Sequence, residues 1–174
     1  MRPTRRRDLV MSNTRFLILR GKENSGKTTL CAEVYRQLLP FAKEKHLFGK
    51  CCEQMKIVVQ DSIKVDEQGN TCDFQALLDV VDKKVAFFSM GDKVSECFKT
   101  GIQSFIDKNV EILVCCTRSQ NRKNSTFKYI EETYTGFCKK VYWTKYAPNK
   151  RDMSGVKQEQ AEEIKQYILA ELKA

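Results

Sequence analysis

The chain has 174 residues, of which 41% are hydrophobic and 30% are charged, and its formal net charge is +9 at pH 7. This length and composition predict one domain with a sizeable core and leave too little chain for two ordinary domains. No apolar run reaches the about 18 residues that span a bilayer, and the N-terminus lacks the apolar stretch of a secretory signal. We therefore expect a cytoplasmic protein with no membrane partner.

The N-terminal residues 1–12 form a basic segment that contains Arg2, Arg5, Arg6 and Arg7. We favour a disordered arm, or a true start at Met11, over an arm that contacts nucleic acid. No aromatic residue is interleaved with these arginines to stack on bases. Positive charge also serves any polyphosphate ligand as well as it serves RNA. Residues 13–174 are expected to form the single domain.

Residues 21–28 fit the pattern G-x-x-x-x-G-K-[ST] of a phosphate-binding loop. The apolar run 16–19 precedes the loop as a predicted strand, and residues 29–39 follow as a predicted helix that ends at Pro40. A strand, a glycine-bounded loop and a helix in this order aim backbone N–H groups and a helix N-terminus at one anion. The two glycines allow the backbone to wrap a phosphate without a Cβ in the way.

Over residues 21–29 the sequence resembles the P-loop NTPase superfamily. The resemblance implies a site for ATP, or GTP, with Mg²⁺, in which Lys27 carries a charge to the β- and γ-phosphates and assists catalysis, and Thr28 is a metal ligand. The expected nucleotide-binding residues are those of the loop and the start of its helix: Gly21, Lys22, Glu23, Asn24, Ser25, Gly26, Lys27, Thr28 and Thr29.

The stretch from the first helix to residue 84 shows weaker patterns. Residues 41–52 are lysine-rich and are interpreted as a connection, and residues 55–65 as a strand or the first arm of a hairpin. A second helix is predicted from Asp73, its N-cap, to residue 84. Its buried face recurs at i, i+3, i+4 and i+7 and consists of Phe74, Leu77, Leu78 and Val81.

The second half of the chain alternates strands and helices. The continuous apolar runs 85–90 and 112–116 predict buried strands of a parallel sheet, and residues 141–144 predict a further strand. Helical periodicity predicts helices over 94–106, from Ser125 or Thr126 to Tyr134, and over 155–173.

This alternation predicts an α/β fold with three layers, α/β/α, and a mainly parallel five-stranded sheet. If the sheet is similar to that of P-loop kinases, its strand order is 2-3-1-4-5, which places the strand 85–90 beside the strand of the phosphate loop. Ligands of such sheets bind beyond the carboxyl ends of the strands.

A carboxylate is needed near Mg²⁺, which keeps octahedral geometry and most of its waters. Asp92 is the first candidate because it follows the strand 85–90, and Ser89 could share the role. Asp61 is the second candidate. Capping of the helix that follows is an equal alternative for Asp92.

Arg118 lies at the end of the strand 112–116 and opens a loop that also contains Arg122 and Lys123. A guanidinium that closes over the transferred phosphoryl group stabilises the charge that develops there. Arg118 is therefore the candidate catalytic cation, with a solvated loop as the alternative, which is favoured for the other two residues.

Two short patterns favour a guanine nucleotide: N-K-x-D at residues 149–152 and D-x-x-G at residues 66–69. Both are weakened by their context, because the second resembles a hairpin turn and the first is separated from its strand. Three classes of function stay open: transfer of a γ-phosphoryl group to a small acceptor, hydrolysis of GTP or ATP by a switch that acts on a partner protein, and nucleotide binding without turnover.

The chain contains eight cysteines and one histidine. Cys51 and Cys52 are adjacent, as are Cys115 and Cys116, so the spacing is not that of a zinc site or of a disulfide framework. We expect reduced thiols that are buried as small apolar residues or incidental, with a redox role for one of the adjacent pairs as the alternative.

Overall fold

The structure is a computed structural model that describes residues 12–22, 25–48, 57–58, 63, 65–118, 124–145 and 150–174. The expected N-terminal arm lies outside the described residues except for Ser12. Other residues of the sequence analysis also lie outside them, among them Glu23, Asn24, Cys51, Cys52, Asp61, Arg122, Lys123 and Asn149.

The described elements alternate strands and helices over most of the chain. In order they are β1 (Arg15–Gly21), α1 (Lys27–Leu38), a 3-10 turn (Leu39–Phe41), β2 (Ala42–Phe48), β3 (Ile57–Val58), β4 (Gln75–Val80), β5 (Lys83–Phe88), α2 (Glu96–Asp107), β6 (Ile112–Arg118), α3 (Thr126–Thr133), β7 (Lys139–Trp143) and α4 (Lys150–Lys173).

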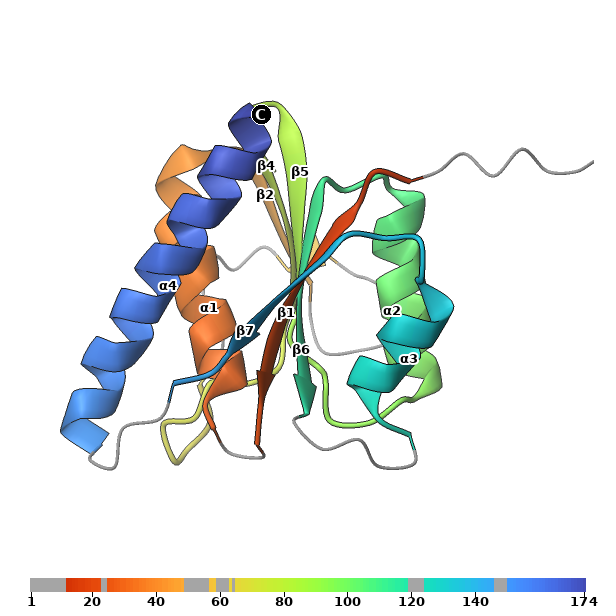
Figure 1. The fold of residues 1–174 in the computed structure, drawn as a ribbon. Helices are drawn as coiled ribbons and strands as arrows, with labels where there is room; N and C mark the ends of the chain where they lie inside the picture. Colours follow the sequence, from red (N-terminus) through yellow and green to blue (C-terminus); the bar gives the residue numbers. More distant parts are fainter. Residues whose placement is uncertain are drawn as a thin grey trace, which may run out of the picture.

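The sheet has seven strands in the order β3-β2-β4-β5-β6-β1-β7. Strands β5, β6, β1 and β7 are parallel, whereas β3, β2, β4 and β5 pair antiparallel. Helices α1 and α4 cover one face of the sheet and α2 and α3 cover the other (Figure 1). The α/β class is confirmed, whereas the expectation of five mainly parallel strands is wrong.

The expected strand order is wrong as well, because β6 lies between β5 and β1. Ile18 of β1 pairs in register with Cys115, and Phe87 of β5 pairs with Val114. The physical reason is burial: six successive residues of β6 are buried, and a strand that is apolar on both faces belongs in the centre of a parallel sheet.

The helix expected from Asp73 to residue 84 is a β-hairpin made of β4 and β5. Phe74, Ala76, Leu78 and Val80 alternate into the core on the α1 side, so a period of two explains the segment better than the helical one. Val81, which the helical interpretation buries, is 44% exposed. Val81 and Asp82 form the turn with φ values of 54° and 59°, the sign that the tight turns of β-hairpins require.

The connection expected over residues 41–52 contains β2. Its sequence Ala-Lys-Glu-Lys-His-Leu-Phe carries too few apolar residues to give a strand pattern. The strand forms because β4 offers a partner along its length, from Ala42 opposite Val80 to Phe48 opposite Gln75. Lys43 adds an exposed ion pair of 2.7 Å to Asp82 in the hairpin turn.

The core is divided by the sheet into two clusters. Leu17, Leu19 and the buried residues of α1 and α4 fill the first, and Phe16, Ile18 and the buried residues of α2 and α3 fill the second. Alternate residues of β1 thus anchor both layers, which fixes the end of this strand and the loop that follows it. Among the helices in the described ranges, none has the length and apolar character needed to cross a membrane.

Cysteines mostly follow the expectation. Cys31, Cys115 and Cys116 are free and buried, and Cys72 and Cys138 are also free. Cys97 is disulfide-bonded, so the expectation of reduced thiols is wrong for this residue.

Candidate functional site

The loop between β1 and α1 lies at the carboxyl end of the parallel strands. Gly26 precedes α1 with φ 80° and ψ 28°, a left-handed conformation that glycine adopts without a steric penalty. A Cβ on Gly21 would lie 2.0 Å from Thr144 Oγ1 and 2.4 Å from Ser25 Oγ. Both motif glycines therefore occupy positions where a larger residue would strain or displace the loop.

Lys27 is the first residue of α1, and its side chain folds back over the loop. Its ammonium donates to the backbone oxygens of Gly21 at 3.0 Å and Lys22 at 2.7 Å. The residue is only 8% exposed. A nearly buried cation is thus held at the loop by carbonyl groups.

Thr28 contacts a carboxylate that sequence reasoning assigned to another role. Its hydroxyl donates to Asp73 Oδ1 at 3.3 Å. Ser89, at the end of β5, donates to the same oxygen at 3.1 Å and accepts from the Phe74 amide at 2.8 Å. The structure therefore brings together Thr28, the expected metal ligand, Ser89, which was expected to share the role of Asp92, and Asp73, the expected helix cap.

Asp92, the first candidate for the metal, pairs instead with Arg118. Arg118 Nε lies 3.4 Å from Asp92 Oδ1, and the two side chains are 34% and 70% exposed. Arg118 is in register with Gly21, the first residue of the loop. Gly91 lies against the same strand, where a Cβ would be 1.8 Å from the Cys116 carbonyl oxygen. Both candidates thus lie near the carboxyl end of β6.

β6 also contacts the last turn of the loop, where α1 begins. The Cys116 thiol lies 3.6 Å from the Lys27 carbonyl oxygen, in a buried position. Arg118 is two residues further along the strand, so its side chain leaves the sheet on the same face as Cys116. This is the face that α1 covers, and Arg118 therefore lies on the same side of the sheet as the loop between β1 and α1.

A second layer of residues supports the loop from β7 and α4. Thr144 donates to the Arg20 carbonyl at 2.9 Å, and its hydroxyl lies 3.2 Å from that of Ser25. Lys157 of α4 donates to the carbonyl oxygens of Ser25 at 2.8 Å and Lys145 at 2.9 Å. The loop is thereby tied to the C-terminal helix.

Lys157 is 2% exposed, and two physical effects act on its ammonium. Burial lowers its pKa, and the charge of Lys27 lowers it further, to about 8. Gln160, one turn further along α4, donates to the Trp143 carbonyl at 2.7 Å and accepts from the Lys145 amide at 3.1 Å. Neither residue was identified from the sequence, although Lys157 lies in line with the inward stripe of Ala161 and Ile164.

Arg20, directly before the loop, lies on the opposite face of the sheet. Its guanidinium carbon is 3.8 Å from the centre of the Phe127 ring and 4.9 Å from that of Trp143. These are distances at which a cation is attracted to an aromatic face. Trp143 is 56% exposed. The strand end that carries the loop is thus held by stacking on one face and by α1 on the other.

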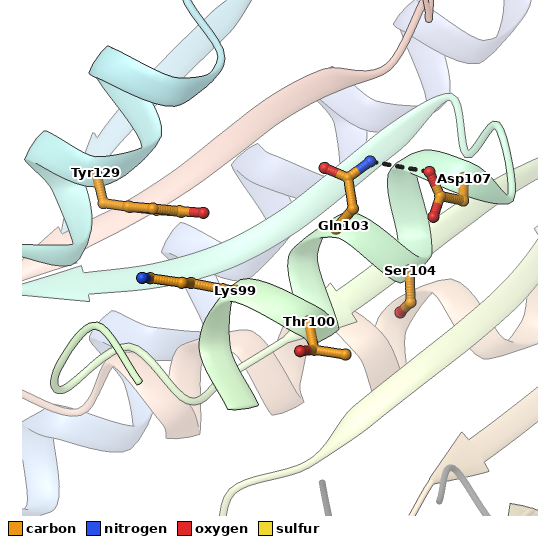
Figure 2. A pocket seen from close by; sticks show the side chains of 6 residues that line it. All are labelled: Lys99, Thr100, Gln103, Ser104, Asp107 and Tyr129. Carbon is orange, nitrogen blue, oxygen red and sulfur yellow. Dashed lines mark hydrogen bonds between the residues drawn. The ribbon is translucent and has the colours of Figure 1, made fainter. Parts of the chain in front are cut away.

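A shallow hollow of about 410 Å³ lies over α2 and α3, lined by Lys99, Thr100, Gln103, Ser104, Asp107 and Tyr129 (Figure 2). Gln103 donates to Asp107 at 2.9 Å and accepts from the Tyr134 hydroxyl at 3.0 Å. The polar groups thus bond to one another, and no expected site residue lines the hollow.

The remaining expectations divide between described and undescribed residues. Asn149 of the N-K-x-D pattern lies outside the described residues, and residues 150–152 open α4. Asp66 of the D-x-x-G pattern accepts from the backbone amides of Gln68 and Asn70 at 3.0 and 2.8 Å. This segment is a turn, as its context indicated.

Comparisons of the chain with protein-family models, with curated proteins and with solved structures give no match.

Proposed function

We propose that the chain binds a nucleoside triphosphate with Mg²⁺ in the loop of residues 21–29 and transfers the γ-phosphoryl group to a small acceptor. One observation carries the proposal: the Lys27 ammonium is held by the carbonyls of Gly21 and Lys22, next to a left-handed glycine that opens a helix. Backbone amides, a helix N-terminus and a fixed cation that converge on one point are what a phosphate group requires.

The metal would be bound by Thr28 and Asp73, with phosphate oxygens and waters completing the octahedron. Their contact of 3.3 Å supports this assignment, because a carboxylate beside the P-loop hydroxyl can hold a metal water or the metal itself. Ser89 would orient the carboxylate through its bond to the same oxygen. This pair replaces Asp92, which is engaged by Arg118.

Arg118 is the proposed catalytic cation. Its register with Gly21 supports the assignment, and its ion pair with Asp92 is exposed enough to be worth at most about 1 kcal/mol. That pair can open when the phosphates arrive, because the triphosphate offers Arg118 more negative charge than one carboxylate does. Arg118 would then stabilise the charge that grows on the transferred group.

ATP is favoured over GTP, because the D-x-x-G residues form a turn of their own around Asp66. A switch that hydrolyses the nucleotide and a module that only binds it are the alternatives. Incubation with Mg-ATP or Mg-GTP and a panel of metabolites separates the three. A phosphorylated acceptor supports the kinase, free phosphate without one indicates the hydrolase, and binding without turnover indicates the module.

The central residue of the proposal is tested by Lys27→Ala. Loss of a cation that faces the phosphates is expected to lower triphosphate affinity or turnover about 100-fold or more. Lys108→Ala, at the exposed end of α2, is the matched control and should have no effect. Circular dichroism checks the fold of both variants. Nucleotide binding that is unchanged in folded Lys27→Ala would refute the proposal.

A further inference from the structure

Lys157 is an unusual residue for the inner face of α4, because burial of an ammonium is costly unless a charge compensates it. Its two described acceptors, the carbonyl oxygens of Ser25 and Lys145, are uncharged. Among the described residues, no carboxylate forms an ion pair with it. The nearest ionisable group that acts on it, Lys27, is also positive. The pair therefore places two positive charges at one loop.

The other charged groups near this junction do not neutralise it. Lys145 pairs with Glu163 of α4 at 3.9 Å, and both side chains are more than half exposed. On α1, Glu33 pairs with Arg36 of its own helix at 3.7 Å. The carboxylates of Glu33 and Glu163 are thus directed to other partners, and the carboxylate of Asp73 accepts hydrogen bonds from Thr28 and Ser89 rather than from Lys157.

The contact between Lys157 and Ser25 also sets the direction of a backbone amide. In a trans peptide the C=O and N–H groups point in opposite directions, and the described residues contain no cis peptide. Because the Ser25 carbonyl points to Lys157, the Gly26 amide points away from α4. This amide belongs to the glycine that opens α1, where an anion is expected to bind.

The fit at this contact leaves room only for glycine. A Cβ on Gly26 would lie 2.9 Å from Lys157 Cε and 3.4 Å from its Nζ. The lysine stem therefore packs directly against the loop backbone from behind. Lys27 holds the carbonyls at the start of the loop, and Lys157 holds the carbonyl at its end.

We propose that Lys157 is a positioning residue of the phosphate site, which directs the Gly26 amide to the ligand and supplies, with Lys27, a second buried charge for which the bound polyphosphate is the counter-ion. This inference rests on the proposed function and deepens it, because it selects ligands with several negative charges. A triphosphate should be preferred over a monophosphate by this site.

A consequence is proton uptake on binding. The pKa of Lys157 is about 8 in the structure described, and a polyanion nearby favours the charged form and raises this pKa. At pH 8.5 the γ-phosphate is already fully ionised, so the ligand itself takes up no proton. A group with a pKa of about 8 is about one-quarter protonated at pH 8.5, so binding of Mg-ATP should be accompanied by uptake of as much as about three-quarters of a proton.

The experiment is titration calorimetry of Mg-ATP at pH 8.5 in two buffers of different ionisation enthalpy. The wild-type protein should show the uptake, and Lys157→Met should lose it and bind about 10-fold more weakly or worse. Lys157→Gln, which keeps a neutral donor for the Ser25 carbonyl, should also lose the uptake but recover part of the affinity. Lys173→Met, at the exposed end of the same helix, is the control and should behave as wild type.

The outcomes separate the two proposals. Absence of any triphosphate binding by the wild-type protein overturns both. Binding without proton uptake between pH 8 and 9 overturns the role of Lys157 and leaves the nucleotide site intact, even if the variants fail to fold. Equal affinity and equal uptake in wild type and folded Lys157→Met overturn it as well.

Discussion

At the scale of single residues, Asp73 changes the interpretation of the proposed metal site. It precedes β4 and contacts Thr28 and Ser89. The helical periodicity of the segment that follows predicts an N-cap at this position and not a site residue. Asp92 follows the most apolar strand of the sequence, yet its carboxylate is 70% exposed and pairs with Arg118. Proximity to Thr28 therefore favours Asp73.

Asp73→Asn and Asp92→Asn should differ in their metal dependence. Loss of the carboxylate beside Thr28 should raise the Mg²⁺ concentration needed for half-maximal nucleotide binding about 10-fold or more, because an amide is a weaker ligand for a hard cation. Asp92→Asn should leave this concentration unchanged. Mg²⁺ titrations of nucleotide binding compare them, and the reverse ranking of the two variants would return Asp92 to the site.

At the scale of elements, two helical glycines have opposite surroundings. A Cβ on Gly101 of α2 would lie 2.2 Å from Cε2 of Phe88, a fully buried ring, whereas a Cβ on Gly155 of α4 meets nothing within 4 Å. Helix propensity favours alanine at both positions by about 1 kcal/mol. Packing against Phe88 should make alanine unfavourable at Gly101, whereas alanine should stay favourable at Gly155.

We expect Gly101→Ala to destabilise the protein by about 1–3 kcal/mol, because α2 must move away from the sheet. Gly155→Ala should stabilise it by about 0.5–1 kcal/mol. Chemical denaturation measures both changes. A stabilising Gly101→Ala would mean that α2 does not pack against Phe88 as described.

The elements differ in how far the sequence predicts them. β1, α1, α2, β6 and α3 follow from local patterns, because each buries one helical stripe or one apolar run. β7 follows from its short run of β-branched and aromatic residues, although none of its residues is fully buried. β2 does not, because a strand with so many polar residues is stabilised by pairing with β4, which is distant in the chain. The apolar run 85–90 predicts β5, but β4 is not predicted because Leu77 and Leu78 also fit a helical period. The alternating burial from Phe74 to Val80 and the exposure of Val81 distinguish the strand from the helix.

The residues of the candidate site also differ in how far the sequence predicts them. The proposed phosphate loop is contiguous, so its spacing alone predicts the roles of Gly21, Gly26 and Lys27. Asp73 and Lys157 lie 46 and 130 residues after Lys27 in the sequence. Their proximity to the loop depends on the strand order and on the packing of α4. Arg118 could be anticipated because the carboxyl ends of parallel strands meet at one edge.

At the scale of the whole molecule, Lys157 links the C-terminal helix to folding as well as to the loop. Its pKa is about 8 in the folded chain and 10.5 for an ordinary lysine. Between these values the unfolded chain binds more protons, so this residue makes stability rise with pH. Below pH 8 both states are protonated and the full penalty of burial is present.

The free energy of unfolding of wild type relative to Lys157→Met should therefore increase between pH 8 and pH 10 and stay constant from pH 6 to pH 7. Taking the difference cancels the other titrating groups. Denaturant titrations across this range measure it. Parallel stability curves for the two proteins throughout would show that the ammonium is not buried in solution.

Trp143 is the only tryptophan of the chain, and its ring is half exposed beside the guanidinium of Arg20. Arg20 directly precedes Gly21 in the chain, and its carbonyl oxygen accepts a hydrogen bond from the Thr144 hydroxyl. Tryptophan fluorescence thus comes from one position, beside Arg20, the residue that precedes the proposed phosphate loop. The protein consequently carries an intrinsic fluorophore beside the end of β1, and quenching or a spectral shift on addition of nucleotide can be measured without a label.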